Sequence, residues 1–383
     1  MDRGRSTILA CLLFLAILAA CSNQAEPVPS ASPAASYAPS PSPAGPPAGN
    51  AAEMQELYRF ISKKLTGPYG VYTNLLETDQ SAEVATGHEI LSESASLMMQ
   101  SAVRSGDTAR FAKEWTLVKQ VFAMEGGFSY RYSPKLEKQY TVNAAVDDLR
   151  MIGALYEAGE AFENPEYKAE AEYYSRNFYN NNVKDGYMFD IYDNYYHNNN
   201  GFITLCYINL NVLRNLSISS ESKGILLHNM SEIIEGGYLS DAFPFYETRF
   251  DYASGAYKSE RIHTVESLLS ILNLAEAGRQ NPESLRFIKE QVAAGTLYGQ
   301  YTRDGQPAND IRSTAIYALA AMIGAAAGDD ALYTDSIARM NEFRITDPAS
   351  PLYGGFGDMK TGQAYSYDNL MALLAYSYSP NNE

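Results

Sequence analysis

Apolar side chains recur along this 383-residue chain with the period of an amphipathic α-helix, in segments separated by polar or glycine-containing loops. One such segment runs from Ile90 to Ser105, with Glu93 near its beginning. Its apolar face follows the i, i+3, i+4, i+7, i+8 spacing through Ala95, Met98, Met99, Ala102 and Val103. Small residues cover much of its remaining surface, which predicts a helix packed by neighbours on several sides.

Twelve segments with this spacing are predicted to be helices. In chain order they span Glu53–Leu65, Ile90–Ser105, Thr108–Phe122, Ala144–Phe162, Pro165–Asn181, Phe202–Leu216, Ser220–Glu235, Ile262–Ala277, Pro282–Ala293, Ile311–Ala327, Asp330–Phe343 and Tyr367–Tyr378. Pro165 and Pro282 stand in the first helical turn, where proline is tolerated. The segments form six consecutive pairs.

The two members of each pair differ in kind. Those that begin near residues 90, 144, 202, 262, 311 and 367 are apolar or small nearly all round, whereas the others carry charges on one face. Two concentric rings of helices require buried helices to alternate with half-exposed ones along the chain. The sequence therefore predicts an all-α fold, an (α/α)6 barrel with six inner and six outer helices.

The loops between these helices are unequal in length. Those from inner to outer helices are short, whereas those from outer to inner helices are long and rich in aromatic residues, as in residues 126–143 and 185–200. Long loops of this kind usually carry function. Because all of them lead into the inner-helix N-termini, we expect an aromatic-lined cleft at that end of the barrel.

The N-terminal residues are typical of a bacterial lipoprotein signal. Arg3 and Arg5 precede an apolar run that is short for a membrane span, and a small-residue site ends at Cys21. We expect a signal peptide at 1–20, a tether rich in Pro, Ala and Ser at 21–52 that begins with lipidated Cys21, and a catalytic domain at 53–383. An ordinary secretory signal with a coincidental cysteine is the alternative. The expected location is extracytoplasmic, with the lipid as the sole membrane attachment.

Composition and motifs exclude several classes of function. The net charge of −16 argues against nucleic acid and against a polyanionic substrate. The four histidines lack metal-ligand spacing, and no P-loop, dinucleotide fingerprint or Gly-x-Ser-x-Gly elbow occurs. We expect no metal and no cofactor, and a monomer. Cys206 is the only cysteine of the domain, which excludes an intrachain disulfide and is more consistent with a core residue than with a nucleophile.

Carboxylates collect before or at the start of each of the six predicted inner helices. They are Glu89, Glu93, Asp147, Asp148, Asp190, Asp193, Asp241, Glu247, Asp251, Glu260, Asp310 and Asp368. Singly, each is explained by helix capping or the helix dipole, but together with 30 tyrosines they predict a sugar site. Glycoside hydrolysis needs one carboxylic acid to protonate the leaving oxygen and one carboxylate to activate water.

At this point the chain resembles glycoside hydrolase family 8, inverting (α/α)6-barrel enzymes, and within it the lipoprotein members associated with exopolysaccharide systems. The family's acid lies in a segment similar to Ser92-Glu93-Ser94, and a second aspartate in a segment similar to Val146-Asp147-Asp148-Leu149. The resemblance implies that Glu93 is the acid and that Asp148 binds the distorted sugar, with Asp147 as the alternative. A helix N-terminus lowers a carboxyl pKa, so burial and nearby acids such as Asp148 must keep Glu93 protonated.

The family's base is replaced here. Many members carry it in a Tyr-Asp-Ala-x-Arg segment, whereas this chain has Lys258 at that place in Tyr257–Arg261. We expect the base in the same long loop, with Asp251 as first choice, Asp241 as second and Glu260 as third. Such a base would lie about 6.5 to 9.5 Å from the acid. Sugar rings are expected to contact Tyr130, Tyr196 and Tyr246.

The predicted function is therefore cleavage of a polysaccharide, a β-linked glucan or an amino-sugar exopolysaccharide, by an inverting mechanism with two carboxylates. A non-catalytic polysaccharide-binding lipoprotein of the same fold would explain the missing base and would release no soluble product. A lyase or an unsaturated-glycoside hydrolase on a similar barrel is a second alternative, although a lyase favours a basic cleft. A protein-interaction scaffold is a third alternative, and its apolar groove is not visible in the loops.

Overall fold

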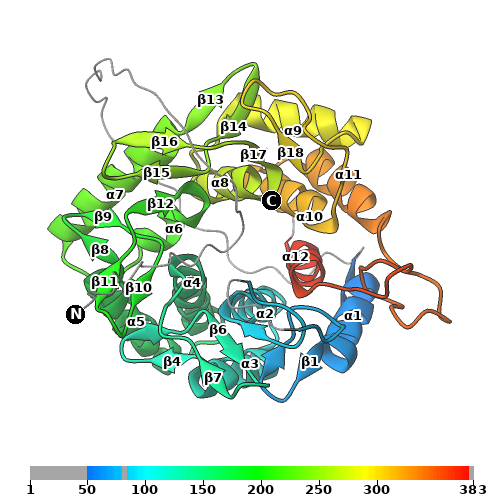
Figure 1. The fold of residues 1–383 in the computed structure, drawn as a ribbon, viewed down its shortest axis with the longest axis horizontal. Helices are drawn as coiled ribbons and strands as arrows, with labels where there is room; N and C mark the ends of the chain where they lie inside the picture. The colour runs from blue at the N-terminus through cyan, green and yellow to red at the C-terminus, as the bar shows by residue number, and fades with distance from the viewer. Residues whose placement is uncertain (1–49, 80–83, 379–383) are drawn as a thin grey trace, which may run out of the picture.

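The computed structural model describes residues 50–79 and 84–378. Six helices form a closed inner ring in which each helix packs against the next and the last against the first. They are α2 (Ser92–Arg104), α4 (Ala145–Ala161), α6 (Leu210–Leu213), α8 (Thr264–Glu276), α10 (Thr314–Ala327) and α12 (Ser366–Ser377). Figure 1 shows this ring, with α12 beside α1 where the chain closes on itself.

The other six α-helices of the described residues form an outer ring around the first. They are α1 (Ala51–Phe60), α3 (Thr108–Val121), α5 (Pro165–Asn182), α7 (Ser220–Gly236), α9 (Pro282–Ala294) and α11 (Asp330–Asn341). The predicted (α/α)6 barrel is confirmed. Burial follows the predicted patterning, because α9 buries only Ser284, Ile288 and Val292, one helix stripe, whereas α10 buries nearly every residue.

Short antiparallel strands occupy the long loops. They are β1 (Thr66–Gly67), β2 (Gly70–Val71), β3 (Ile90–Leu91), β4 (Ala123–Met124), β5 (Gly127–Phe128), β6 (Arg131–Ser133), β7 (Lys138–Gln139), β8 (Val183–Lys184), β9 (Tyr187–Met188), β10 (Tyr192–Asp193), β11 (Asn198–Asn199), β12 (Phe202–Thr204), β13 (Tyr238–Ser240), β14 (Phe243–Tyr246), β15 (Arg249–Asp251), β16 (Ala256–Lys258), β17 (Ile262–His263) and β18 (Gln300–Tyr301). Sheets β3-β6-β7 and β12-β15-β16 join loops that are distant in the sequence.

The third inner helix is the main departure from the sequence prediction. Residues 202–216 were expected to form one helix, but they form β12, a 3-10 helix over Leu205–Tyr207 and the single-turn helix α6. Phe202 pairs with Asp251 and Thr204 with Arg249, so the β12 segment is held in a sheet. The Asn209 side chain caps α6 at Val212 and so begins the helix late.

Smaller departures occur at helix ends. Ile90–Leu91 and Ile262–His263 are strands rather than first helical residues, because they pair with β6 and β18. Residues 61–65, expected to continue the first helix, form a π-helix. The predicted signal peptide, Cys21 and residues 21–49 of the tether lie outside the described residues.

The barrel end opposite the inner-helix N-termini is closed by a charged cluster around Arg104. Its guanidinium lies 3.8 Å from the carboxylate of Glu157, 3.5 Å from that of Glu276 and 4.1 Å from the ring centroid of Tyr378. The Tyr378 hydroxyl donates a hydrogen bond to Glu276. Because this cluster ties the C-terminal ends of α2, α4 and α8 together, access to the barrel interior is expected at the other end.

Gly324 allows α10 and α11 to approach closely. A Cβ at this position would lie 2.6 Å from the backbone nitrogen of Tyr333, and backbone cannot yield as a flexible side chain can. We predict that Gly324→Ala lowers the free energy of unfolding by about 1–3 kcal/mol, as overpacking does. Chemical denaturation would measure it. Gly224→Ala on the exposed face of α7 meets nothing within 4 Å and should stabilise by about 0.5–1 kcal/mol. Equal stabilities for the two variants would contradict this packing.

Candidate active site

Glu93 lies in the first turn of α2, at the open end of the barrel. Its side chain is half-buried, yet burial raises its pKa to about 7. The negative charge of Asp147 raises this pKa further, and Arg150 opposes the increase. A carboxyl group that is desolvated while still reached by solvent lies in a recess. Near neutral pH such a group can hold a proton and donate it, as a general acid must.

Asp147, in the first turn of α4, is held on two sides. The Ser92 hydroxyl donates to its Oδ2 at 2.7 Å, and the Arg150 guanidinium donates to its Oδ1 at 3.0 Å. Asp147 is 3% exposed and its charge acts on Glu93. Ser92, Glu93, Asp147 and Arg150 therefore form one network at the junction of α2 and α4.

Asp148, the expected sugar-binding residue, points into a different environment. It is 3% exposed, and its Oδ2 accepts a hydrogen bond from Asn143 Nδ2 at 2.9 Å. The backbone N–H of Phe128 donates to it as well, and Asn143 also bonds to Asn182 on α5. Asp148 thus fastens loops and the outer helix to α4. Asp148 Oδ1 has no hydrogen-bond partner among the described residues. Asp147, the alternative from the sequence, is the aspartate that shares a hydrogen-bond network with the N-terminus of α2.

The charge of Glu93 acts on two tyrosines. Tyr207 lies in the 3-10 helix and Tyr367 in the first turn of α12, and both are partly exposed. Burial raises the pKa of each phenol, with the charge of Glu93 among the further causes. Both phenols therefore stay protonated and can donate hydrogen bonds to a sugar hydroxyl beside the acid. The sequence analysis did not single out either residue.

A second pair of carboxylates lies on another side of the ring. Asp190 accepts hydrogen bonds from the Thr204 N–H and the Thr204 hydroxyl, each at 2.6 Å. Glu266 lies in the first turn of α8 and receives a hydrogen bond from Thr248. Burial raises the pKa of each carboxyl to about 7; the charge of Asp190 raises that of Glu266 further, and Arg249 opposes it.

Glu266 was missed by the sequence analysis, which looked for the base in the loop before α8 and not in the helix itself. A signal for it was available. Glu93, Asp147, Glu266 and Asp368 all stand in the first turn of inner helices, α2, α4, α8 and α12. In the described part of the chain, the N-cap residues of these four helices make no side-chain capping hydrogen bond. The first-turn acids are therefore left as the polar groups at these helix ends.

The three expected base residues occupy less favourable positions. Asp251 lies on β15, where hydrogen bonds from Ser254 and an ion pair with Lys258 at 2.9 Å lower its pKa to about 2. Asp241 is exposed in a turn, where the Tyr238 hydroxyl donates to it. Glu260 is exposed beside β17. Asp251 shares the β12-β15-β16 sheet with Arg249, which connects it to the Asp190 and Glu266 region.

The three expected sugar-contacting tyrosines differ strongly in exposure. Tyr130 is 5% exposed, packs against Tyr140 and hydrogen-bonds to Arg131. Tyr246 is 4% exposed and belongs to the core between β14 and α8. Tyr196 is 70% exposed at the tip of the β10–β11 hairpin, beside the equally exposed Tyr195. Only Tyr196 of the three presents its ring to solvent.

Several other carboxylates of this end have structural roles. Glu89, fully buried, forms a two-bond ion pair with Arg131 at 2.9 and 2.7 Å. Glu247 pairs with Arg303. Asp193 accepts the backbone N–H groups of Tyr195 and Tyr196 and so shapes the hairpin.

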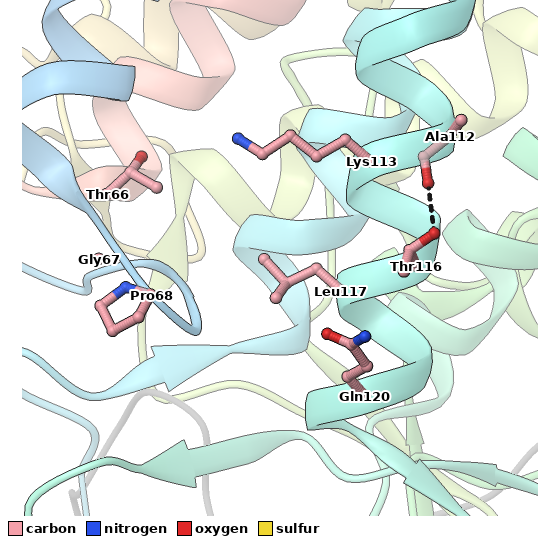
Figure 2. Close-up of a pocket in the computed structure, with 8 residues that line it drawn as sticks. All are labelled: Thr66, Gly67, Pro68, Ala112, Lys113, Thr116, Leu117 and Gln120. Carbon is pink, nitrogen blue, oxygen red and sulfur yellow. Dashed lines mark hydrogen bonds between the residues drawn. The ribbon is translucent and has the colours of Figure 1, made fainter.

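Within residues 50–79 and 84–378, no group of three or more His, Cys, Asp or Glu side chains is placed to hold a metal ion. No helix in the same residues has the length and hydropathy to cross a bilayer. Figure 2 shows a groove between the β1–β2 turn and α3, lined by Thr66, Gly67, Pro68, Ala112, Lys113, Thr116, Leu117 and Gln120. None of these lining residues is a carboxylate.

The coupling of Glu93 to Asp147 predicts a shift in pH dependence. Asp147→Asn removes a negative charge that raises the pKa of Glu93, so this pKa should fall. Because the acid acts only when protonated, the alkaline limb of the kcat/KM profile should move to lower pH. The asparagine oxygen can still accept a hydrogen bond from Arg150, and its amide nitrogen can donate one to the Ser92 hydroxyl. A profile with an unchanged alkaline limb on a cleaved polysaccharide would show that Asp147 does not act on the acid.

Comparisons with known proteins agree with the (α/α)6-barrel fold. No family model matches the sequence. The chain is 26% identical over 336 residues to the Bacillus subtilis (strain 168) protein named "Putative lipoprotein YdaJ", which covers 85% of this chain and 87% of that protein. The fold of the present chain is similar to that of endoglucanase Cel10, a family 8 glycosyl hydrolase from Klebsiella pneumoniae. The TM-score is 0.58 and the identity 15%, and the alignment covers 84% of this chain and 98% of that one.

A more similar solved structure is that of a novel alpha-amylase from Clostridium perfringens. It has a TM-score of 0.80 and 31% identity, and the alignment covers 87% of this chain and 99% of that one. The chain therefore belongs to the same family as this amylase, and it shares the (α/α)6-barrel fold of the family 8 glycoside hydrolases.

Proposed function

We propose that this protein hydrolyses the glycosidic bonds of a polysaccharide by an inverting mechanism with two carboxylates, and that Glu93 is the acid. The observation that carries the proposal is the state of Glu93, a half-buried first-turn carboxyl with a pKa of about 7 beside Asp147. Membership of a glycoside hydrolase group supports the same chemistry.

The proposed reaction proceeds in one displacement. Glu93 gives its proton to the glycosidic oxygen while the bond from that oxygen to the anomeric carbon breaks. A water molecule attacks the opposite face of the anomeric carbon, and a carboxylate base takes its proton. Asp147, fixed by Ser92 and Arg150, binds the sugar whose ring is distorted at this carbon. Tyr207 and Tyr367 donate hydrogen bonds beside the acid.

The substrate class is narrowed by charge and by the relatives. The net charge of −16 disfavours an acidic polysaccharide. From the sequence we propose a β-linked glucan or an amino-sugar exopolysaccharide, and the amylase relative adds α-linked glucan to the candidates. Tyr195 and Tyr196 are exposed as flat surfaces for sugar rings outside the centre.

The proposed location is the outer face of the cell membrane. Cys21 is its lipid attachment site, residues 21–52 are the tether, and the protein acts as a monomer. The related Bacillus subtilis lipoprotein supports this proposal. Release of the protein into the medium by Cys21→Ala, measured by cell fractionation, is the expected result.

The experiment that tests the function incubates the tether-less domain with a panel of polysaccharides and measures release of reducing ends. The panel contains α-linked and β-linked glucans, chitosan and bacterial exopolysaccharides. Soluble product from at least one polymer is expected. The alternative, a non-catalytic polysaccharide-binding lipoprotein, predicts binding to a polymer with no product at any pH between 5 and 8.

A further inference from the structure

Resting on the proposed hydrolase function, we infer that Glu266 is the catalytic base that activates the attacking water, and that Asp190 is the residue that positions and tunes it. The inference replaces the loop carboxylates expected from the sequence with a carboxylate on an inner helix. Three independent features of the structure support it: position on the ring, an unoccupied carboxylate oxygen, and the surrounding charges.

Glu93 and Glu266 lie on inner helices that face each other across the ring. The inner helices follow one another in the order α2, α4, α6, α8, α10, α12, so α8 lies opposite α2. Figure 1 shows α2 and α8 on opposite sides of the ring. Glu93 and Glu266 both stand in the first turn of these helices, at the same end. This arrangement suits an inverting enzyme, whose acid and base act on opposite faces of one sugar.

The turn between α4 and α8 connects the two carboxylates. The charges of Asp190, Asp147 and Glu93 raise the pKa of Tyr207. The charges of Glu266 and Asp190 raise the pKa of its neighbour Cys206, and that of Arg150 lowers it. The Cys206 carbonyl also accepts a hydrogen bond from Asn273 on α8 at 3.0 Å. This 3-10 turn therefore borders both carboxylate pairs. Because the third inner helix is shorter than expected, this turn lies between the two carboxylate pairs where a helix was predicted.

The Glu266 carboxylate has one oxygen free. Thr248 supplies a hydrogen bond to the carboxylate, but Oε2 has no hydrogen-bond partner among the described residues although it is buried. A buried carboxylate oxygen without a partner is costly and uncommon in a folded protein. Oε2 therefore has the capacity to accept a further hydrogen bond.

Asp190 is fixed so that it acts on Glu266 through its charge. Both of its oxygens are occupied by Thr204, and Thr204 is held opposite Arg249 in the β12–β15 ladder. Leu205 N–H also donates to the Thr248 carbonyl at 2.9 Å, which places Thr248 beside this turn. Because Thr204 already occupies Asp190, this aspartate is unsuited to accept a proton from water and serves as a positioning residue.

The charges around Glu266 suit a base that works near neutral pH. Burial raises its pKa to about 7, Asp190 raises it further, and the Thr248 hydrogen bond and Arg249 lower it; Cys206 is the other titratable neighbour. Asp251, by contrast, is paired with Lys258 and has a pKa of about 2. A carboxylate with the higher pKa takes a proton from water more effectively while it is still ionised at neutral pH.

The proton balance of the step is closed. The water oxygen bonds to the anomeric carbon and its proton passes to Glu266, while the leaving oxygen takes the proton of Glu93. After turnover Glu266 is protonated and Glu93 is ionised. Exchange with solvent returns both to their starting states, which two groups with a pKa near 7 permit.

The test uses Glu266→Ala and Glu266→Gln in the tether-less domain, with a polymer that the wild-type protein cleaves. Each variant should lose about 10²- to 10⁴-fold in kcat. Sodium azide should restore turnover to Glu266→Ala alone, because azide attacks without a base, and the product should be a glycosyl azide of inverted configuration. Azide should not restore Glu93→Gln, which lacks the proton donor. Thermal melts establish that each variant is folded.

Asp190→Asn supplies a second readout. It removes a charge that raises the pKa of Glu266. Because the base acts when ionised, the acidic limb of the kcat/KM profile should move to lower pH while the alkaline limb stays in place. A residue with a purely structural role would change the height of the profile without moving one limb.

The outcomes separate this inference from the proposed function. No cleavage by the wild-type protein contradicts the hydrolase function itself. Cleavage by the wild-type protein together with full activity of Glu266→Ala overturns only the role of Glu266. A folded Glu266→Ala protein that binds the sugar but gains no azide product overturns it too. A large loss that azide relieves in Asp251→Ala assigns the base to Asp251 instead.

Discussion

Replacement of Glu93 by glutamine is expected to lower kcat for polysaccharide hydrolysis by about 10²- to 10⁴-fold, because glutamine cannot protonate the leaving oxygen. The side chains are nearly the same size, and Glu93 makes no buried ion pair that the change would break; Arg150 binds Asp147 instead. The fold and the affinity for sugar should therefore change little. Reducing-end release measures the first effect, and titration calorimetry with an oligosaccharide the second.

The matched control for this prediction is Glu290→Gln on the outer helix α9. This substitution makes the same chemical change on an exposed surface, where Glu290 pairs with Arg286 at 2.8 Å. It should retain wild-type activity. Full activity of the Glu93→Gln protein, with Glu290→Gln equally active, would show that another group supplies the proton.

The largest effect on stability is expected at Glu89. This carboxylate is fully buried, accepts two hydrogen bonds from the Arg131 guanidinium and one from the Thr86 backbone at 3.0 Å. Glu89→Gln leaves the buried guanidinium without its counter-charge, which costs about 3–5 kcal/mol in other proteins. We expect a loss of this size in the free energy of unfolding, measured by urea denaturation monitored by circular dichroism.

The reason lies in the position of the pair within the fold. Glu89 precedes β3 and Arg131 begins β6, and the ladder between Leu91 and Arg131 joins the first two long loops directly above α2. Glu290→Gln, which breaks an exposed pair, should cost less than about 1 kcal/mol. Losses of equal size at Glu89 and Glu290 would contradict the structural role assigned to the buried pair.

The barrel was predictable from the sequence because its two rings leave different patterns. Inner helices are buried on all sides, as in α10, and outer helices bury one stripe, as in α9, so alternation alone indicated concentric rings. The third inner helix was not predictable in this way. The apolar run from Phe202 to Leu213 fits a buried helix or a buried strand equally well, and the pairing of β12 with β15, nearly 50 residues later, decides between them.

The proposed acid, Glu93, could be named from the sequence because it stands in the first turn of a buried helix. Which of two adjacent aspartates lies next to it was not predictable. Asp147 and Asp148 are about 100° apart around α4, and the loops that contact them decide which one reaches Ser92 and Arg150 and which one reaches Asn143. Glu266 was missed because the family pattern directs attention to the loop before α8. Its position in the first turn, like that of Glu93, would have identified it.

The tyrosines show a similar limit. Tyr130 and Tyr246 belong to aromatic, loop-rich segments, yet packing against Tyr140 and against α8 buries both. Tyr196 is exposed because Asp193 shapes a tight hairpin tip by accepting backbone N–H groups. Sequence composition indicated a tyrosine-rich end of the barrel, but exposure of single rings depends on contacts that only the fold supplies.

The central claim is that Glu93 and a carboxylate across the ring perform a single displacement at the anomeric carbon. The most direct measurement is proton nuclear magnetic resonance of the first product released from the polysaccharide that the wild-type protein cleaves, recorded before its anomers equilibrate. We expect a new reducing end with the anomeric configuration opposite to that of the bond cleaved. A first product with the original configuration, or no reducing end from any polymer, would contradict it.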